Sequence, residues 1–249
     1  MSQTLKPIFC RVGSKRPIAK ILLEYFPQHK TYVEPFLGGG AMFFAKPPSE
    51  KEVIGDLDEE LMRDYELINK VSINSKMPNL DTPEKVVEFY ENNRTDNMAK
   101  LYKAIIGRCA GFSSMQVKKN GKLYKFPNPY SKVKNIAEYK ERLDGVRMYV
   151  SSYDKLIKKY DSPSTFFYLD PPYEKSGQLY KDSMIDYEEM ANLLSKIKGK
   201  FMLSINDSPY IRKVFSNFNI IPIKVKDEGA KFGKRLGDRK ELVITNYNN

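Results

Sequence analysis

The chain has 249 residues, of which 41% are hydrophobic, and a formal net charge of +11; this size fits one α/β domain with a smaller insert. No apolar run approaches the roughly 20 residues that cross a bilayer, and residues 1–10 lack the apolar core of a secretory signal. We therefore expect a soluble, intracellular protein of the cytoplasm or nucleoid, or of a host cell if the chain is viral. The positive charge favours a polyanionic partner.

The cysteines and the histidine argue against metal and nucleophile chemistry. Cys10 and Cys109 are too few for a disulfide framework, and no metal-ligand pattern surrounds them. We interpret them as buried or incidental thiols. His29, the single histidine, has no nucleophile pattern nearby, which argues against a Ser–His or Cys–His pair. The sequence predicts no metal site.

Short apolar runs, rich in β-branched and aromatic residues, predict seven buried strands. In chain order they are Thr31–Phe36, Glu52–Gly55, Met148–Ser151, Thr165–Leu169, Lys200–Ile205, Ile220–Val225 and Leu242–Thr245. Helical patterns separate most of them, over Pro17–Phe26, Glu59–Asn69, Tyr187–Ile197 and Pro209–Phe215. The alternation predicts an α/β fold whose mostly parallel sheet has helices on both faces. The last strand follows a glycine-rich loop without a helix, so we expect it to run antiparallel to its neighbour.

Residues 71–146 break this alternation. They contain a helical run, Glu84–Ile106, and then Asn120-Gly121 between two short extended runs. Asn-Gly is a strong hairpin signal because both turn residues need positive φ. We therefore predict an inserted domain of helices and a basic hairpin over 71–146, and a main domain formed by 1–70 and 147–249.

A glycine motif follows the first predicted strand. Val33-Glu34-Pro35-Phe36-Leu37-Gly38-Gly39-Gly40 leads into an apolar segment, Ala41–Phe44, that can open a helix. Glycines let the backbone approach a ligand closely, and a helix N-terminus offers free N–H groups. The G-x-G-x-x-G spacing of a dinucleotide site and the Gly-Lys-Ser/Thr of a P-loop are both absent.

An acidic residue, Asp56, ends the second predicted strand. A carboxylate at this place suits hydrogen bonds to ribose hydroxyls. Together with the glycine motif it indicates a cofactor that carries a nucleoside but no pyrophosphate. The alternative is a glycine turn without a ligand and an Asp that caps the next helix.

A second motif, Asp170-Pro171-Pro172-Tyr173, comes directly after the apolar strand Thr165–Leu169. In a doubly wound sheet, ligands bind at the carboxyl ends of the strands. The prolines fix the backbone and remove two donors, so the Asp170 carboxylate and nearby carbonyls form a fork of acceptors for a planar amino group. Tyr173 can lie over a flat ring. The alternative is a plain turn with a helix cap.

The two motifs together resemble those of the Dam-type (class D12) N6-adenine DNA methyltransferases along nearly the whole chain. Arg11-Val-Gly-Ser-Lys15 resembles the family's N-terminal cofactor segment, Glu34–Gly40 its glycine motif, and Asp56-Leu-Asp58 its ribose motif. Asp170–Tyr173 resembles the catalytic motif, and Ser204–Asp207 and Lys231–Tyr247 resemble the closing segments. Arg11 stands where many members have an aromatic residue. The family's fold is a Rossmann-like, seven-stranded methyltransferase sheet, with a target-recognition insert between the glycine and catalytic motifs.

The resemblance implies S-adenosylmethionine as the methyl donor, S-adenosylhomocysteine as the product, and no metal. The cofactor residues it implies are Arg11, Lys15, Glu34, Phe36, Gly38, Gly39, Gly40, Asp56 and Asp170. Asp154 is a candidate partner for the cofactor's adenine; alternatively it caps a short helix over Lys155–Tyr160. The catalytic residues implied are Asp170, Pro171, Pro172 and Tyr173. They would receive an adenine flipped out of the duplex, with Tyr173 stacked on its ring and Asp170 and the Pro171 carbonyl accepting its N6 hydrogens.

The partner implied is double-stranded DNA, read at a short specific sequence by a monomer or weak dimer. A cognate restriction endonuclease is a candidate partner protein. Two-stranded ribbons fit the major groove, so we assign DNA contacts to the hairpin region. The assigned residues are Arg108, Gln116, Lys118, Lys119, Asn120, Lys122, Tyr124, Lys125 and Asn128. A solvated hairpin with no partner is the alternative, and the basic loop Lys226–Lys240 either closes over the base or is a surface loop.

Other functions differ at the catalytic motif. Cytosine N4 methyltransferases more often have Ser in place of Asp170, and protein-glutamine methyltransferases usually have Asn. An RNA adenine is a further alternative target. An inactive DNA-binding module would have lost Asp170, Tyr173 or the glycines, all of which are present.

Overall fold

The computed structural model describes residues 5–11, 13–74, 80, 85, 88–89, 91–92, 94–110, 134–173, 185–225 and 239–248. The chain divides into two compact units. One is made of Met1–Pro17, Gly38–Pro48 and Asp58–Met148, and the other of Ile18–Leu37, Ser49–Leu57 and Tyr149–Asn249. Each unit therefore combines segments that are far apart in the sequence.

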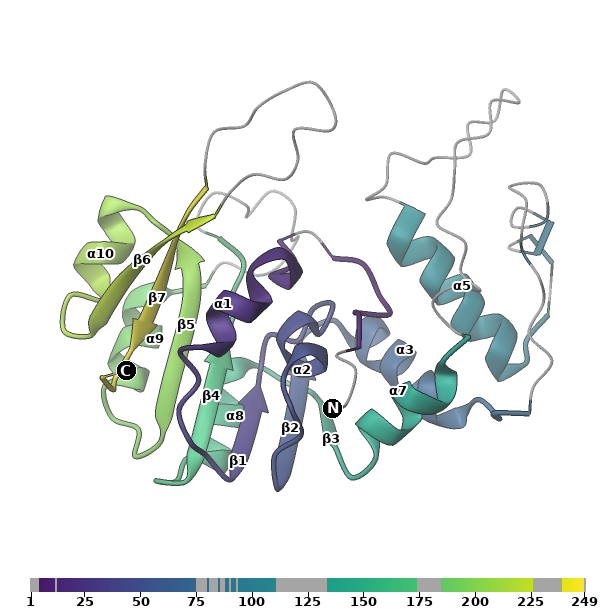
Figure 1. The fold of residues 1–249 in the computed structure, drawn as a ribbon, viewed down its shortest axis with the longest axis horizontal. Coiled ribbons are helices and arrows are strands. Elements are labelled where there is room, and N and C mark those ends of the chain that lie inside the picture. Colours follow the sequence, from purple (N-terminus) through teal and green to yellow (C-terminus); the bar gives the residue numbers. More distant parts are fainter. Residues whose placement is uncertain are drawn as a thin grey trace. The chain divides into compact units, whose positions relative to one another are not determined.

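The strands form one seven-stranded mixed sheet with the order β3-β2-β1-β4-β5-β7-β6 (Figure 1). Their bounds are β1 (Thr31–Glu34), β2 (Lys51–Asp56), β3 (Arg147–Val150), β4 (Thr165–Leu169), β5 (Lys200–Asn206), β6 (Asn219–Val225) and β7 (Arg239–Thr245). β1 runs parallel to β2 and β4, and β4 to β5, whereas β7 is antiparallel to both β5 and β6. The seven predicted strands and the antiparallel last strand are confirmed, but the expected burial is wrong for the two edge strands: β3 has no buried residue, and Ile223 is the one buried residue among Asn219–Ile223 of β6.

One face of the sheet is apolar. Its register aligns Val53, Val33, Phe167 and Phe201 across β2, β1, β4 and β5, and none of these side chains is more than 1% exposed. The helices that pack against this face are α8 (Tyr153–Tyr160), α9 (Tyr187–Leu194) and α10 (Pro209–Val214). Because alternate residues of a strand share a face, this row explains the continuous apolar runs in the sequence.

The opposite face carries buried polar groups. The Tyr32 hydroxyl donates to Glu34 at 2.7 Å, and the hydroxyls of Tyr168 and Ser204 lie 2.8 Å apart. Phe26, which follows the short helix α1 (Ala19–Leu23), packs its ring 4.7 Å from that of Phe166 and 6.0 Å from that of Tyr32. The α1 segment therefore covers this face, so helical segments lie on both sides of the sheet, as predicted.

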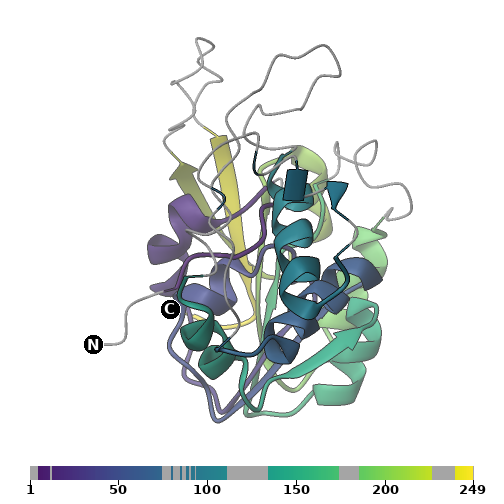
Figure 2. The same ribbon diagram turned by 90° about the vertical axis from the view of Figure 1, so that its right-hand side faces the viewer.

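Helices dominate the first unit. They are α2 (Ala41–Ala45), α3 (Glu59–Lys70), α5 (Asn97–Ala110) and α7 (Ile136–Leu143), and α3 packs against both α5 and α7 (Figure 2). Asp58 caps α3 by accepting from the Leu61 amide at 2.9 Å. Asp96 does the same for α5 through the Ala99 amide. The predicted helical run Glu84–Ile106 is confirmed over Asn97–Ile106 and at the earlier described residues Lys85, Glu88, Phe89 and Glu91, but it is interrupted before Asn97. No helix among the described residues is long and apolar enough to cross a membrane.

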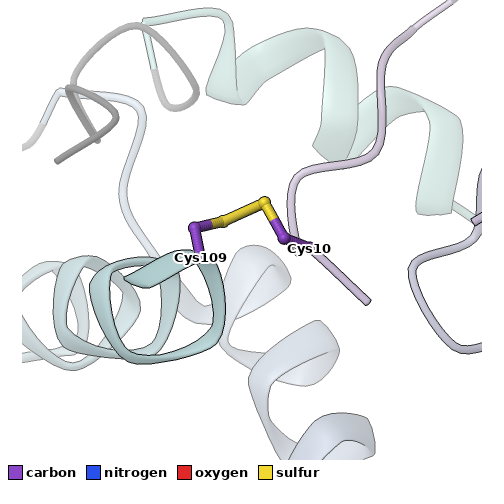
Figure 3. Close-up of a disulfide and its surroundings, with 2 residues drawn as sticks. All are labelled: Cys10 and Cys109. Carbon is purple, nitrogen blue, oxygen red and sulfur yellow. A yellow bond between two sulfur atoms is a disulfide. The ribbon is translucent and has the colours of Figure 1, made fainter. Parts of the chain in front are cut away.

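A disulfide joins two segments of this unit. Cys10, in the N-terminal segment, is bonded to Cys109 near the end of α5, with their Cα atoms 4.9 Å apart (Figure 3). The expectation of two unpaired thiols is therefore wrong. The cysteines are separated by 99 positions in the sequence, and only the fold brings them together.

Candidate active site

Acidic and polar side chains gather where the parallel strands of the sheet end. Glu34 ends β1, Asp56 ends β2, Asp170 follows β4 and Asn206 ends β5. β7 runs in the opposite direction and begins at the same edge, where Glu241 pairs with Asn206 in the register. We call this the carboxyl edge. It is the place where open α/β sheets bind their ligands.

The charges at this edge act on the tyrosines behind it. Burial raises the pKa of Tyr168 well above its usual range, and the negative charges of Asp170, Glu34 and Glu241 add to the shift, against the bond from Ser204. Burial and the neighbouring Glu34 likewise raise the pKa of Tyr32. Both tyrosines stay neutral hydroxyl groups, and the negative charge of the edge resides on its carboxylates.

The turn Asp170–Tyr173 is held from two sides. The Tyr187 hydroxyl, on α9, donates to the Pro172 carbonyl, which fixes the backbone of the turn. The Tyr173 hydroxyl donates to the Glu241 carboxylate on β7. The predicted catalytic turn thus lies at the carboxyl edge, with its carbonyls and its ring anchored by different elements.

Asp56 lies at the same edge on β2. Its carbonyl accepts from the Ser151 amide at 3.1 Å, and the carbonyl of the preceding Gly55 accepts from the Leu37 amide at 2.9 Å. A Cβ on Gly55 would lie 2.5 Å from the Leu156 side chain, so a glycine is needed where β2 meets α8. Asp56 is not the cap of the next helix, since Asp58 has that role.

Asp154 and Phe36 lie near the start of α8. The Asp154 carboxylate pairs with Lys158 at 3.2 Å, and its bond from Ser152, followed by the Lys158 pairing, lowers its pKa. Phe36 stacks on Tyr153 with ring centroids 5.4 Å apart. The helix begins at Tyr153, after Ser152, so Asp154 is in its first turn rather than at its cap.

The glycine turn lies, from Gly38 onward, in the first unit. Gly38 has φ +48° and Gly40 has φ +69°, conformations that L-residues with a side chain avoid. A Cβ on Gly39 would lie 3.0 Å from the Phe9 carbonyl, so the N-terminal segment requires a glycine there. The Tyr65 hydroxyl on α3 donates to the Gly38 carbonyl at 3.2 Å. Gly40 then begins α2, as the predicted turn into a helix requires.

Arg11 belongs to a charge network of the same unit. It pairs with Asp58 at 2.5 Å, and Arg108 on α5 reaches Asp58 at 3.5 Å and also pairs with Asp64. Burial raises the pKa of Asp64, and the Arg108 guanidinium opposes that shift. The side chain of Arg108 is 13% exposed, so in this structure it joins α5 to α3. Its assignment to DNA stays a prediction.

The predicted site residues therefore fall into three groups. Glu34, Phe36, Asp56, Asp154 and Asp170–Tyr173 belong to the unit of the sheet, whereas Arg11, the buried Lys15 and Gly38–Gly40 belong to the first unit. The predicted DNA contacts from Gln116 to Asn128 and most of the loop Lys226–Lys240 lie outside the described residues. The part of the chain that the structure describes contains no cluster of ligands for a metal ion.

Sequence reasoning missed Glu241 and Asn206. Both lie inside stretches that resemble the family's closing segments, but no motif singled them out. Glu241 is 6% exposed and contacts Tyr173 of the predicted catalytic motif. The available signal was a carboxylate directly before the apolar run Leu242–Ile244, and the strand order was needed to interpret it.

Comparison with known families agrees with this geometry. Residues 12–228 match the D12 class N6 adenine-specific DNA methyltransferases, and the chain belongs to this family. It is thus an enzyme of the adenine-specific DNA methyltransferase class, as its two motifs predict.

Individual relatives match along nearly their whole length. Type II methyltransferase M1.LlaDCHI of Lactococcus lactis subsp. cremoris is 28% identical over 98% of this chain and 96% of its own. Type II methyltransferase M.CviBI of Paramecium bursaria Chlorella virus NC1A is 26% identical over 98% of this chain and 100% of its own. The DNA adenine methylase of Escherichia coli K12 is 20% identical over 92% and 90%, respectively. Among solved structures, a precorrin-6y C5,15-methyltransferase from Geobacter metallireducens GS-15 aligns over 98% of this chain and 100% of its own, with a TM-score of 0.43 and 8% identity.

Proposed function

We propose that this enzyme takes a methyl group from S-adenosylmethionine and transfers it to the exocyclic N6 of an adenine flipped out of a short specific sequence in double-stranded DNA. The observation that carries the proposal is the position of Asp170–Tyr173 at the carboxyl edge, among Glu34, Asp56 and Glu241. The nearest alternatives are methyl transfer to cytosine N4 and methyl transfer to an RNA adenine. They differ from the proposal in the methyl acceptor that the same edge would hold.

The carboxyl edge fits the proposed cofactor. S-adenosylmethionine, when bound, supplies an electrophilic methyl group on a positively charged sulfur. The buried Glu34 and Asp170 give this edge the negative charge that suits its sulfonium and ammonium groups. Asp56 is placed to accept from ribose hydroxyls, and Phe36 offers an aromatic surface. Arg11, Lys15 and Gly38–Gly40 remain further proposed cofactor residues.

The turn would orient the target amino group. The Pro172 carbonyl already accepts from Tyr187, so we assign the Pro171 carbonyl, with the Asp170 carboxylate, to the two N6 hydrogens. Two acceptors in fixed positions would direct the nitrogen lone pair toward the methyl group. Tyr173 would stack on the adenine ring. Rate enhancement would then come from orientation and from preorganised charge.

DNA binding would involve the predicted insert of residues 71–146. The lysines of its predicted hairpin would contact phosphate, while Asn, Gln or Arg side chains would read base edges. Adenine inside a duplex is out of reach of an active site, which makes base flipping part of the proposal.

The test is methyl transfer from labelled S-adenosylmethionine to a DNA duplex, with the modified bases mapped by sequencing. Asp170→Ala removes one acceptor for the N6 hydrogens, and loss of such a contact costs about a hundredfold or more in turnover. Glu50→Ala, which changes an exposed carboxylate just before the start of β2, outside the predicted insert and away from the carboxyl edge, is the control and should retain full activity. A folded Asp170→Ala enzyme with the parent's turnover would refute the assignment, and methyl groups found on cytosine or only on RNA would change the target.

A further inference from the structure

Glu241 and Tyr173 meet although 68 positions separate them in the sequence. The contact exists because β7 enters the sheet antiparallel beside β5, which brings its first residues to the edge where β4 ends. Glu241 is directly opposite Asn206 in that pair, and opposed residues of antiparallel strands point their side chains to the same face. Topology therefore places a carboxylate and an amide beside the catalytic turn.

Burial of Glu241 is not explained by stability. The residue is 6% exposed, and its Oε2 atom, like Oδ1 of Asn206, has no hydrogen-bond partner among the described residues. A buried carboxylate that lacks part of its hydrogen bonding costs free energy, and an apolar residue in its place is often neutral or stabilising. A residue that the fold does not need, in contact with a catalytic ring, indicates a role in function.

Tyr173 has a reason to need an anchor. The bond from Tyr187 to the Pro172 carbonyl holds the backbone of the turn, but it does not fix the side-chain torsions of Tyr173, which is partly buried against the apolar core. The hydroxyl bond to Glu241 fixes the far end of the side chain. With backbone and hydroxyl both held, the position of the ring and the direction of its long axis are set before a base arrives. A phenolic O–H prefers to lie in the plane of its ring, so the bond to Glu241 also disfavours rotation about that axis.

We propose that Glu241 is a positioning residue for the methyl-transfer reaction, which acts by holding the Tyr173 ring in the position at which the flipped adenine stacks on it. This inference rests on the proposed function. The role requires a hydrogen-bond acceptor at Oε1 and does not require the negative charge. Glu241→Gln retains an acceptor of the same length, whereas Glu241→Ala removes it.

The first experiment compares turnover with binding. Misplacement of a group that orients the substrate costs about ten- to a hundredfold, so kcat of Glu241→Ala should fall by that factor. The KM for DNA and the calorimetric affinity for S-adenosylhomocysteine should change less than about threefold. For comparison, a tenfold change in affinity corresponds to about 1.4 kcal/mol. Glu241→Gln should restore kcat to within a few-fold of the parent, and neither variant should unfold at a lower urea concentration.

The second experiment observes the base itself. A duplex carries the methylation site mapped for the parent enzyme, with 2-aminopurine at the target adenine, and its fluorescence is recorded on binding in the presence of S-adenosylhomocysteine. The signal with Glu241→Gln should equal that of the parent, and the signal with Glu241→Ala should differ. Tyr173→Phe deletes the same hydrogen bond from the other side, so it should match Glu241→Ala, and the double variant should be no worse than either.

These results separate the inference from the function on which it rests. If the parent methylates adenine but Glu241→Ala has the parent's kcat and fluorescence, the positioning role is overturned. A loss of kcat in Glu241→Gln equal to that in Glu241→Ala would also overturn it, since charge would then be the property required. If Glu241→Ala fails to fold, Tyr173→Phe decides alone, and full activity in that variant refutes the role. Failure of the parent to methylate any adenine would instead refute the proposed function.

Discussion

The disulfide between Cys10 and Cys109 provides a quantitative test of the fold. It closes a loop of 99 positions, and in the chain-entropy model a bond across about 100 residues removes unfolded-state freedom worth about 4.7 kcal/mol. The folded geometry does not depend on the bond alone, because Arg11 and Arg108, the sequence neighbours of the two cysteines, both contact Asp58. Reduction should therefore leave the protein folded and lower its stability by about 4 kcal/mol.

Thermal unfolding of oxidised protein, with and without reductant, measures this loss. For a chain of this size, 1 kcal/mol corresponds to a Tm shift of about 2–4 °C, so reduction should lower Tm by about 8–16 °C. Cys109→Ser is the control: its Tm should equal that of the reduced parent and should not respond to reductant. Cys10→Ser should behave identically, and the double variant should add nothing.

Two outcomes would contradict this reasoning. One is that reductant leaves the Tm of the parent unchanged, or lowers the Tm of Cys109→Ser as much as that of the parent. The other is a count of two free thiols in the unreduced, denatured protein. The protein is oxidised before the comparison, so that every molecule starts with the disulfide formed.

Three further predictions concern the glycine turn, the charge network and the insert. Gly40→Ala should lower the free energy of unfolding in urea by about 2 kcal/mol, because positive φ costs about 1–2 kcal/mol and the new Cβ would lie 3.0 Å from Phe44 and Tyr65. Gly145→Ala, at φ +68° in open space, should lose only the backbone part. Equal losses in the two variants would exclude a packing effect. Arg108→Leu leaves Asp64 buried without its guanidinium and should cost about 3–5 kcal/mol near pH 7. Burial raises the pKa of Asp64 in the folded state above its value in the unfolded state. The contribution of Asp64 to folding stability is therefore complete below the unfolded-state pKa and is lost as pH rises through the folded-state pKa. Without Arg108 the folded pKa rises further, and the deficit should shrink at acidic pH; a deficit independent of pH would mean that Arg108 acts by packing. Replacement of Lys118, Lys119 and Lys122 of the predicted hairpin by Ala should weaken binding to all duplexes alike. It should also lower the slope of log affinity against log salt concentration by about one per lost contact. An unchanged slope would show that another surface binds the DNA.

Most strands of the fold could be predicted because the central strands are nearly continuous buried runs. Val33, Phe167 and Phe201 belong to one aligned apolar row, and such strands are visible in sequence without any knowledge of their partners. Local detail was less accessible. The predicted helix Pro17–Phe26 is a 3₁₀ turn, Arg16–Ile18, followed by α1. The Ser14 hydroxyl accepts from the Arg16 amide at the start of this turn.

The site could be predicted where its residues are adjacent in sequence. Asp170–Tyr173 and Gly38–Gly40 are local motifs, and backbone geometry alone gives them meaning. Glu241 and the partners of Arg11 could not be inferred, because their contacts depend on strand order and on helix packing. The same is true of the disulfide, since neither cysteine has a neighbour that marks it as paired.

The position of β7 constrains the order in which this protein can form during synthesis. β6 pairs with β7, which lies between it and β5, so residues 219–225 can only join the sheet after residues 239–245 have been made. The ribosome must therefore release nearly the whole chain before the last two strands are added, and β6 waits as an unpaired apolar segment until then. Non-local pairing of this kind is slow and exposes strand edges to aggregation. A stop codon just before β7 would therefore remove Glu241 and also leave the exposed edge of β5 as a template for other chains.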